Sequence, residues 1–243
     1  MSGVILTTVA IGGWYPKGAA RLIQKMGEIS PGYDIHAFVN TLPAGAPANV
    51  IEDGYDYTGY CAKPFALLEA KNAGADIAIL LDAAFYPIRP IEPLVDYIAQ
   101  TGYFFCRNGF SVGEWASDRC LEHMAVPRER AFKIEELSSY CVGLNFSDRR
   151  CHGLLDLWCT CAADRVTFPG PHTAIDHEGR NKGFVSTDSR VRGHRHDQTV
   201  LSILAHFMGM TQMVDRPRFT AYKAEYGGHS DETTVFENEG MGS

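Results

Sequence analysis

Apolar and polar stretches alternate along the first half of the chain in a way that predicts strands separated by helices. Short apolar segments rich in β-branched or aromatic residues are expected to be strands, and they are residues 4–10, 34–40, 76–82 and 103–106. Helices are expected after residue 16, over 63–73 and over 91–98. Because residues 76–82 stay apolar without alternation until Asp82, we predict a central strand that is covered on both faces.

The second half of the chain is less regular. Its expected elements are a helix over 112–123, a strand over 140–146, a helix over 148–163 and a helix that starts at Asp197. The stretch 41–59 holds prolines and glycines at irregular intervals and is expected to be an ordered loop. From Ser230 onward the chain is acidic and rich in glycine, so we expect a loose tail.

This order of strands and helices predicts a single α/β domain over residues 1–229, followed by the polar tail over 230–243. The architecture that such an order favours is an open, mostly parallel, twisted sheet with helices on both faces. With 243 residues, of which 45% are hydrophobic, the chain is long enough to bury one core of this kind.

The composition of the chain argues against several classes of protein. The chain has 22 basic and 29 acidic residues and a formal net charge of -7, which argues against a surface built to hold polyanions. Its 7 cysteines are irregularly spaced, and no leader segment is recognisable, so we expect a reduced, cytoplasmic protein. No apolar run approaches the roughly 20 residues that a membrane-spanning helix needs, so we expect no membrane span.

The chain departs from the sequence motifs of several common functional sites. Residues 12–18 lack the Gly-Lys-Ser/Thr ending of a phosphate-binding loop, and no G-x-G-x-x-G follows the first predicted strand. His194 and His196 resemble part of a metal-hydrolase motif, but Asp197 comes one place early and Gln198 stands where a histidine should follow. We therefore favour neither a dinucleotide fold nor a dinuclear zinc site.

Three polar residues remain as candidates for chemistry. Asp82 ends the predicted central strand, at the edge where open α/β sheets bind ligands. Asp197 stands at a helix start, where it could equally be an N-cap. His229 follows Gly227-Gly228, whose glycines would let the backbone fold closely over a ligand, although an ordinary surface histidine is the simpler interpretation.

Three stretches carry a resemblance to a known family. Residues 63–82 form a helix with an early lysine, then Gly74-Ala75-Asp76, then an apolar strand that ends in aspartate. Residues 195–202, Arg-His-Asp-Gln-Thr-Val-Leu-Ser, are similar to an Asp-Gln-x-x-Leu-Ser/Asn helix start, and residues 141–146 look like a Gly-x-x-x-Phe strand. Over residues 4–229 the chain resembles the GT-A fold of nucleotide-sugar glycosyltransferases, of the glycogenin-like and bacterial or viral glycan transferase type.

The resemblance implies roles for individual residues. Asp197 would be catalytic, either holding the transferred sugar or acting as general base toward the acceptor hydroxyl. Asp82 would meet the ribose or a metal ion. The residues that would bind the nucleotide sugar are Thr8, Ala10, Lys63, Asp82, Ala84, Arg195, His196 and Gln198.

Ala84 is a departure from the family's Asp-x-Asp motif, because it stands where the second aspartate is expected. Two ways remain to neutralise the charge of a leaving diphosphate. One is a divalent ion, Mn²⁺ or Mg²⁺, held by Asp82 and His229. The other is the segment 180–196, which carries five basic residues against one acidic residue and would close over the diphosphate as a flap.

The sequence thus predicts a glycosyltransferase that moves a sugar from a nucleotide diphosphate, most simply UDP, to an acceptor hydroxyl. The acceptor could be a glycan, a protein or a modified nucleic-acid base, as in viral DNA glucosylation. The acidic balance disfavours a nucleic acid, whereas the basic segment and the aromatic side chains of Trp14 and Trp115 leave this acceptor open. Alternatives are a sugar nucleotidyltransferase, for which Gly12-Gly13 is a poor loop, and a non-catalytic nucleotide-sugar-binding protein.

Overall fold

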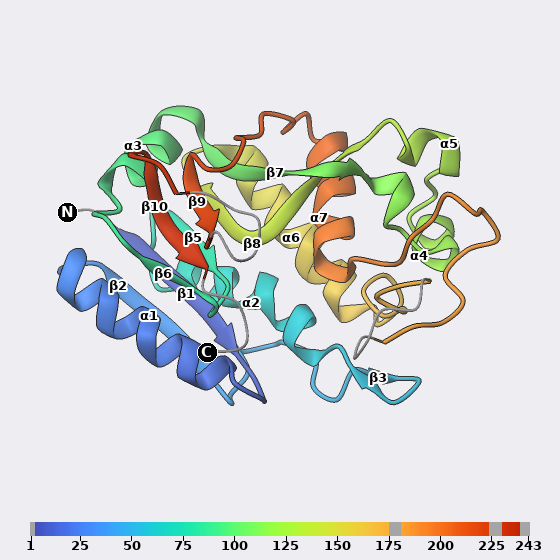
Figure 1. The fold of residues 1–243 in the computed structure, drawn as a ribbon, viewed down its shortest axis with the longest axis horizontal. Helices are drawn as coiled ribbons and strands as arrows, with labels where there is room; N and C mark the ends of the chain where they lie inside the picture. The colour runs from blue at the N-terminus through green and yellow to red at the C-terminus, as the bar shows by residue number, and fades with distance from the viewer. Residues whose placement is uncertain (1–2, 175–180, 224–229, 239–243) are drawn as a thin grey trace.

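The computed structural model describes residues 3–174, 181–223 and 230–238. Within them, a five-stranded sheet has the order β2-β1-β5-β8-β7 (Figure 1). Its strands are β1 (Val4–Ala10), β2 (Asp34–Val39), β5 (Ile77–Leu81), β7 (Tyr103–Ser111) and β8 (Glu135–Asn145). β1 pairs in parallel with β2 and β5, whereas β8 is antiparallel to both β5 and β7. All strands except β8 therefore run in one direction, which confirms the mostly parallel sheet.

Helices cover the sheet on both faces, as the pattern of β5 predicted. The main helices are α1 (Tyr15–Ile29), α2 (Thr58–Asn72), α3 (Glu92–Thr101), α6 (Arg149–Ala163) and α7 (His196–Phe207). Ala78 and Leu80 of β5 belong to the core that includes α2, α6 and α7. Ile77, Ile79 and Leu81 point to the other face and join the core that includes α1 and α3. Every residue of β5 is buried.

A second, three-stranded sheet packs beside α1 and α3 (Figure 1). It consists of β6 (Phe85–Pro87), β10 (Thr234–Asn238) and β9 (Phe219–Tyr222), in that order. The prediction of a loose tail from Ser230 onward is wrong for β10, whose Val235 and Phe236 are 2% and 0% exposed. The prediction missed Val235 and Phe236 because the residues around this short strand are acidic or glycine.

Other boundaries differ from the prediction because short elements replace loops. The expected loop 41–59 contains a small hairpin, β3 (Ile51–Glu52) and β4 (Tyr55–Asp56), and the start of α2. The expected helix 112–123 is divided into η1 (Val112–Glu114) and α4 (Asp118–His123), since the Ser117 side chain accepts a hydrogen bond from the Cys120 N–H and starts a new helix. A short helix, α5 (Arg128–Ala131), follows.

None of the helices in the described ranges is long and apolar enough to cross a membrane.

The carboxyl ends of β1 and β5 lie side by side because the two strands are parallel neighbours. Helix α1 packs closely against the turn that follows β5, since a Cβ on Gly18 would overlap the carbonyl oxygen of Ala83. This glycine therefore fixes the position of the turn that carries Asp82.

We expect Gly18→Ala to lower the free energy of unfolding by about 1–3 kcal/mol, the usual cost of overpacking against atoms that cannot move away. Gly27→Ala, on the same helix with nothing within 4 Å of the added methyl group, is the matched control and should stabilise the protein by about 0.5–1 kcal/mol. Urea unfolding followed by circular dichroism measures both variants. Equal effects of the two substitutions would show that Gly18 is not a packing constraint.

Candidate functional site

One cleft lies at the carboxyl edge of the main sheet. It consists of two adjoining hollows of about 360 and 350 Å³, which share Tyr15, Tyr55, Tyr60, Lys63 and Asp82. We call the hollow lined by residues 9 and 11–13, after the end of β1, the glycine side. We call the hollow lined by His172 and residues 195–198, at the start of α7, the histidine side.

The glycine side exposes backbone rather than side chains. Gly12 and Gly13 have φ angles of 69° and 54°, in the left-handed region that favours glycine. The Gly12 N–H donates a hydrogen bond to Asn40 Oδ1 at the end of β2, over 3.0 Å. No atom lies within 4 Å of where a Cβ of either glycine would stand, so a ligand can approach the main chain here.

Lys63 joins two carboxylates at the centre of the cleft. Its Nζ lies 2.8 Å from Asp82 Oδ1 and 3.0 Å from Asp197 Oδ2. The side chains of Lys63, Asp82 and Asp197 are 11%, 32% and 3% exposed. Helix α2, the end of β5 and helix α7 thus place one cation between two anions, in the layer between the sheet and its helices.

Electrostatics favour the charged form of this lysine. Burial opposes the charge, but the attraction of Asp197 and Asp82 outweighs it and raises the pKa of Lys63 above its ordinary value. For Asp197, burial raises the pKa, the nearby Lys63 lowers it and the like charge of Asp82 raises it further. Asp197 lies inside the first turn of α7 and does not cap the helix, whose N-cap position is Arg195. Its carboxylate is bound by Lys63 instead.

Arg195 and Gln198 bring further polar groups to the histidine side. The guanidinium of Arg195 stacks 3.9 Å from the centre of the Trp115 ring. Gln198 Oε1 accepts a hydrogen bond of 3.4 Å from the Ser139 N–H. The side chain of Gln198 also hydrogen-bonds the buried carboxylate of Glu136, so this amide is held between β8 and the wall of the cleft.

Five tyrosines line the cleft, and the sequence analysis did not single them out. They are Tyr15, Tyr55, Tyr60, Tyr140 and Tyr222. Burial raises the pKa of Tyr60 and Tyr15, so both phenols remain protonated donors. The run Tyr55, Tyr57, Tyr60 was a signal that could have been used, since it places two amphipathic rings just before α2 and a third in its first turn.

Some of the residues that were predicted to bind the nucleotide sugar lie outside the cleft. The side chains of Thr8 and Ala10 are both 0% exposed and do not line the cleft, where Val9 and Ile11 stand instead. Ala84 is also buried, and its carbonyl oxygen accepts a hydrogen bond of 2.9 Å from Arg21 Nη2. The strand alternates its faces, so the residues of β1 that we selected point into the packed layers.

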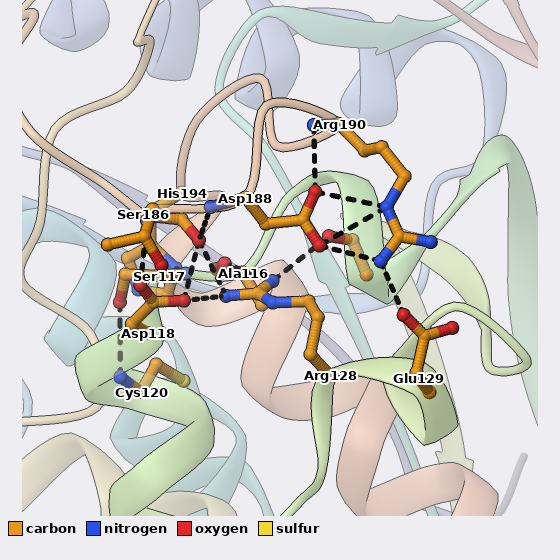
Figure 2. A network of polar contacts seen from close by, with 12 residues as sticks. Ala116, Ser117, Asp118, Cys120, Arg128, Glu129, Ser186, Asp188, Arg190 and His194 are labelled. Carbon is orange, nitrogen blue, oxygen red and sulfur yellow. Dashed lines mark hydrogen bonds and ion pairs between the residues drawn. The ribbon is translucent and has the colours of Figure 1, made fainter.

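The basic segment 180–196 does not form a free cationic flap in the part that the structure describes. Figure 2 shows Arg190 bound to Asp188 and Glu129, and Arg128 bound to Asp118, which also accepts from Ser186. Arg192 Nε lies 3.5 Å from Glu114 Oε1. Arg180 lies outside the described residues. Of the arginines in this segment whose positions are described, Arg195 is the one that lines the cleft.

The two tryptophans that were candidates for nucleic-acid binding are largely covered. Trp115 is 8% exposed, beneath Arg195. Trp14 is half-buried and packs on Tyr15, with ring centres 4.9 Å apart. Neither is therefore an open stacking platform.

The metal prediction rests on Asp82 and His229. Asp82 reaches the cleft, where its Oδ1 is bound by Lys63, and His229 lies outside the described residues. Among the residues with described positions, no group of three or more metal-binding side chains comes together.

By sequence, the chain matches no protein-family model and no curated protein. Its fold, however, is similar to solved glycosyltransferase structures. A glycosyltransferase involved in the glycosylation of the major capsid of PBCV-1 has 9% identity and a TM-score of 0.51, over 97% of this chain and 93% of that chain. The apo structure of the bifunctional glycosyltransferase WbbM has 10% identity and a TM-score of 0.55, over 100% of this chain and 46% of that chain. The chain thus has a glycosyltransferase fold and spans about half of WbbM.

A double-mutant cycle tests the central ion pair. Lys63→Met should cost about 3–5 kcal/mol of unfolding free energy, because it leaves the buried Asp197 without its cation. Asp197→Leu should cost less, because Asp82 still binds Lys63. The double variant should lose much less than the sum of both. The control is Lys71→Met on the same helix, whose Nζ is 3.8 Å from the exposed Asp156 and which should cost less than about 1 kcal/mol. Additive single effects would contradict the pairing.

Proposed function

We propose that this protein is a glycosyltransferase that moves a sugar from a nucleotide diphosphate, UDP in the simplest case, to an acceptor hydroxyl. The observation that carries the proposal is the Lys63 bridge between Asp82 and Asp197, in a cleft at the carboxyl edge of a glycosyltransferase fold. Open α/β sheets bind ligands at this edge. A buried cation flanked by carboxylates offers groups for both the phosphates and the hydroxyls of such a donor.

Each part of the cleft suits one part of the donor. The nucleotide fits the glycine side, where the main chain is accessible beside the flat rings of Tyr15 and Tyr55. The diphosphate then lies near the Lys63 ammonium. The transferred sugar extends to Asp197, whose carboxylate lines the same hollow and can accept hydrogen bonds from its hydroxyls. The acceptor enters through the histidine side.

The chain's own cations neutralise the leaving diphosphate in this proposal. Lys63 and Arg195 both line the cleft. Because Asp82 and Asp197 already compensate the charge of Lys63, Arg195 adds the further positive charge, and a fixed positive charge in a partly dehydrated site stabilises a developing anion strongly. The missing second carboxylate at Ala84 fits this arrangement, because Asp82 already holds Lys63. Asp197 positions the lysine and the sugar.

A glycan is the acceptor class that the cleft favours. Tyrosines provide apolar faces with hydroxyl donors, which suits sugar rings. A nucleic-acid track would need free basic side chains next to exposed aromatic rings, whereas Arg190 and Arg192 are engaged in ion pairs and Trp115 is buried.

Donor binding and turnover test the proposal directly. In a thermal-shift screen of UDP-glucose, UDP-galactose, UDP-N-acetylglucosamine and GDP-mannose, at least one donor should stabilise the protein by about 2.7 kcal/mol at 100 times its Kd. The same donor should release its nucleotide slowly in water. Asp197→Asn should reduce this release by about 10²–10³-fold, and Asp156→Asn, 66% exposed outside the cleft, should leave it unchanged. A shift without release would identify a non-catalytic binding protein, and no shift would refute the proposal.

Metal removal distinguishes the two sources of positive charge. We expect turnover with EDTA to stay within about twofold of turnover with Mn²⁺ or Mg²⁺, whereas Lys63→Met should lose at least about 10²-fold with or without metal. Nucleotide release is the measurement in both cases. Loss of turnover in EDTA, recovery with Mn²⁺ and failure of His229→Ala to recover would instead establish a metal held by Asp82 and His229.

A further inference from the structure

A buried carboxyl group, that of Glu136 in β8, lies behind the wall of the histidine side. Glu136 is 0% exposed, and acidic side chains are rarely buried so completely unless they have partners. Its Oε2 accepts a hydrogen bond of 2.6 Å from Asn108 Nδ2 on the neighbouring strand β7. The proposed function makes no use of this group.

Glu136 interacts with two residues that line the cleft. The side chain of Gln198, in the first turn of α7, hydrogen-bonds its carboxylate, while Gln198 Oε1 accepts from the Ser139 N–H over 3.4 Å. Arg195, at the N-cap of α7, attracts the same carboxylate electrostatically. Both Gln198 and Arg195 line the histidine side. Glu136 therefore lies one layer of side chains away from the space that a ligand would occupy.

Arg195 is held in place by Trp115. The backbone N–H of Arg195 donates a hydrogen bond of 3.1 Å to the carbonyl oxygen of Trp115, and its guanidinium stacks 3.9 Å from the centre of the Trp115 ring. An aromatic ring attracts a guanidinium but does not remove its net charge. An anion in the cleft and the carboxylate of Glu136 therefore interact with the same positive charge.

Opposing effects bring the titration of Glu136 close to neutrality. Burial disfavours the carboxylate, whereas the charge of Arg195 and the hydrogen bonds from Asn108 and Gln198 favour it. Burial is the largest of these effects, and it raises the pKa of Glu136 to about 8. Both the neutral and the ionised form of the carboxyl group are therefore accessible near physiological pH.

Other charged groups on the elements around Glu136 are bound in ion pairs. They are Glu114 of η1, bound by Arg192, Arg107 of β7, bound by Glu135 and Asp215, and Asp197 of α7, bound by Lys63. Glu114 opposes the ionised form of Glu136. His196 of α7 is neutral, because burial lowers its pKa well below the ordinary value. A change in the charge of Glu136 therefore acts chiefly on Arg195.

We propose that Glu136 controls how strongly the cleft binds the diphosphate of the donor, a role that rests on the proposed function. The ionised carboxyl group offsets the positive charge of Arg195 and repels the diphosphate, whereas the protonated group does neither. Glu136 is thus a positioning residue, because it acts through Arg195 and Gln198 from behind the cleft wall. Its burial keeps the effect strong, since buried charges are only weakly screened by water and salt.

Donor binding and protonation of Glu136 favour each other in this arrangement. A bound diphosphate and an ionised Glu136 are two negative charges close to one arginine, so the diphosphate favours the neutral form of Glu136. By linkage, protonation of Glu136 raises the affinity for the donor by the same factor. The affinity should therefore fall as the pH rises through the range in which Glu136 loses its proton.

Calorimetric titration with the nucleotide sugar selected by the thermal-shift screen tests the proposal. From about pH 6.5 to about pH 8.5, the affinity of the wild type should fall by about fourfold, as the neutral form of a group with a pKa of about 8 is depleted. Glu136→Gln cannot ionise, so its affinity should change by less than about twofold and exceed that of the wild type by about fourfold at the higher pH. Glu135→Gln, one residue earlier in β8 with a side chain 44% exposed, is the matched control and should behave as the wild type.

Arg195→Met provides a second variant, which decides the question if Glu136→Gln does not fold. It removes the charge through which Glu136 acts, so its affinity should be lower than that of the wild type and independent of pH over the same range. A carboxyl group with a structural role alone would lower the unfolding free energy of Glu136→Gln and leave the pH dependence of binding in place. That result, a wild type without pH dependence, or pH dependence that persists in Arg195→Met would overturn the role of Glu136 alone. Failure of the wild type to bind any donor at either pH would instead overturn the proposed function, and the role of Glu136 with it.

Discussion

The arrangement of the cleft depends on one buried ammonium group. Lys63 is held by Asp82 from the end of β5 and by Asp197 from the first turn of α7. Such a group is tolerated in a protein interior only when its partners are in place. Helix α2, the central sheet and helix α7 must therefore be docked together before the charge is compensated. The same contact that stabilises the layers determines where the carboxylates of the cleft stand.

This dependence accounts for the uncommon backbone conformations near the cleft. Gly12 and Gly13 turn the chain away from β1, and His196 starts α7 with a positive φ. Glycine adopts a positive φ at no steric cost, but for His196 this conformation is costly and persists where the surrounding structure enforces it. Here the well-packed core beneath the cleft, with β5 buried throughout, provides that enforcement. The described walls of the cleft are thus built on that core.

Local sequence patterns were sufficient for the framework of this fold but insufficient for its long-range pairings. The apolar run 4–10 coincides with β1, and Asp82 could be placed at the sheet edge because a buried strand must end there. The faces of β1 could not be read from a run that is apolar on both sides. The ion pair between Arg190 and Glu129 joins residues that are 61 positions apart, so the sequence could not show that the charge of Arg190 is neutralised. His172 lies in a segment without periodicity and gave no signal.

The ion pair also limits what the carboxylates of the cleft can do. A carboxylate committed to Lys63 can orient hydroxyls and phosphates, but it holds its charge to compensate the lysine. Protonation of Asp197 would leave the buried Lys63 ammonium with one partner fewer, so the ion pair opposes a change in the charge of either group.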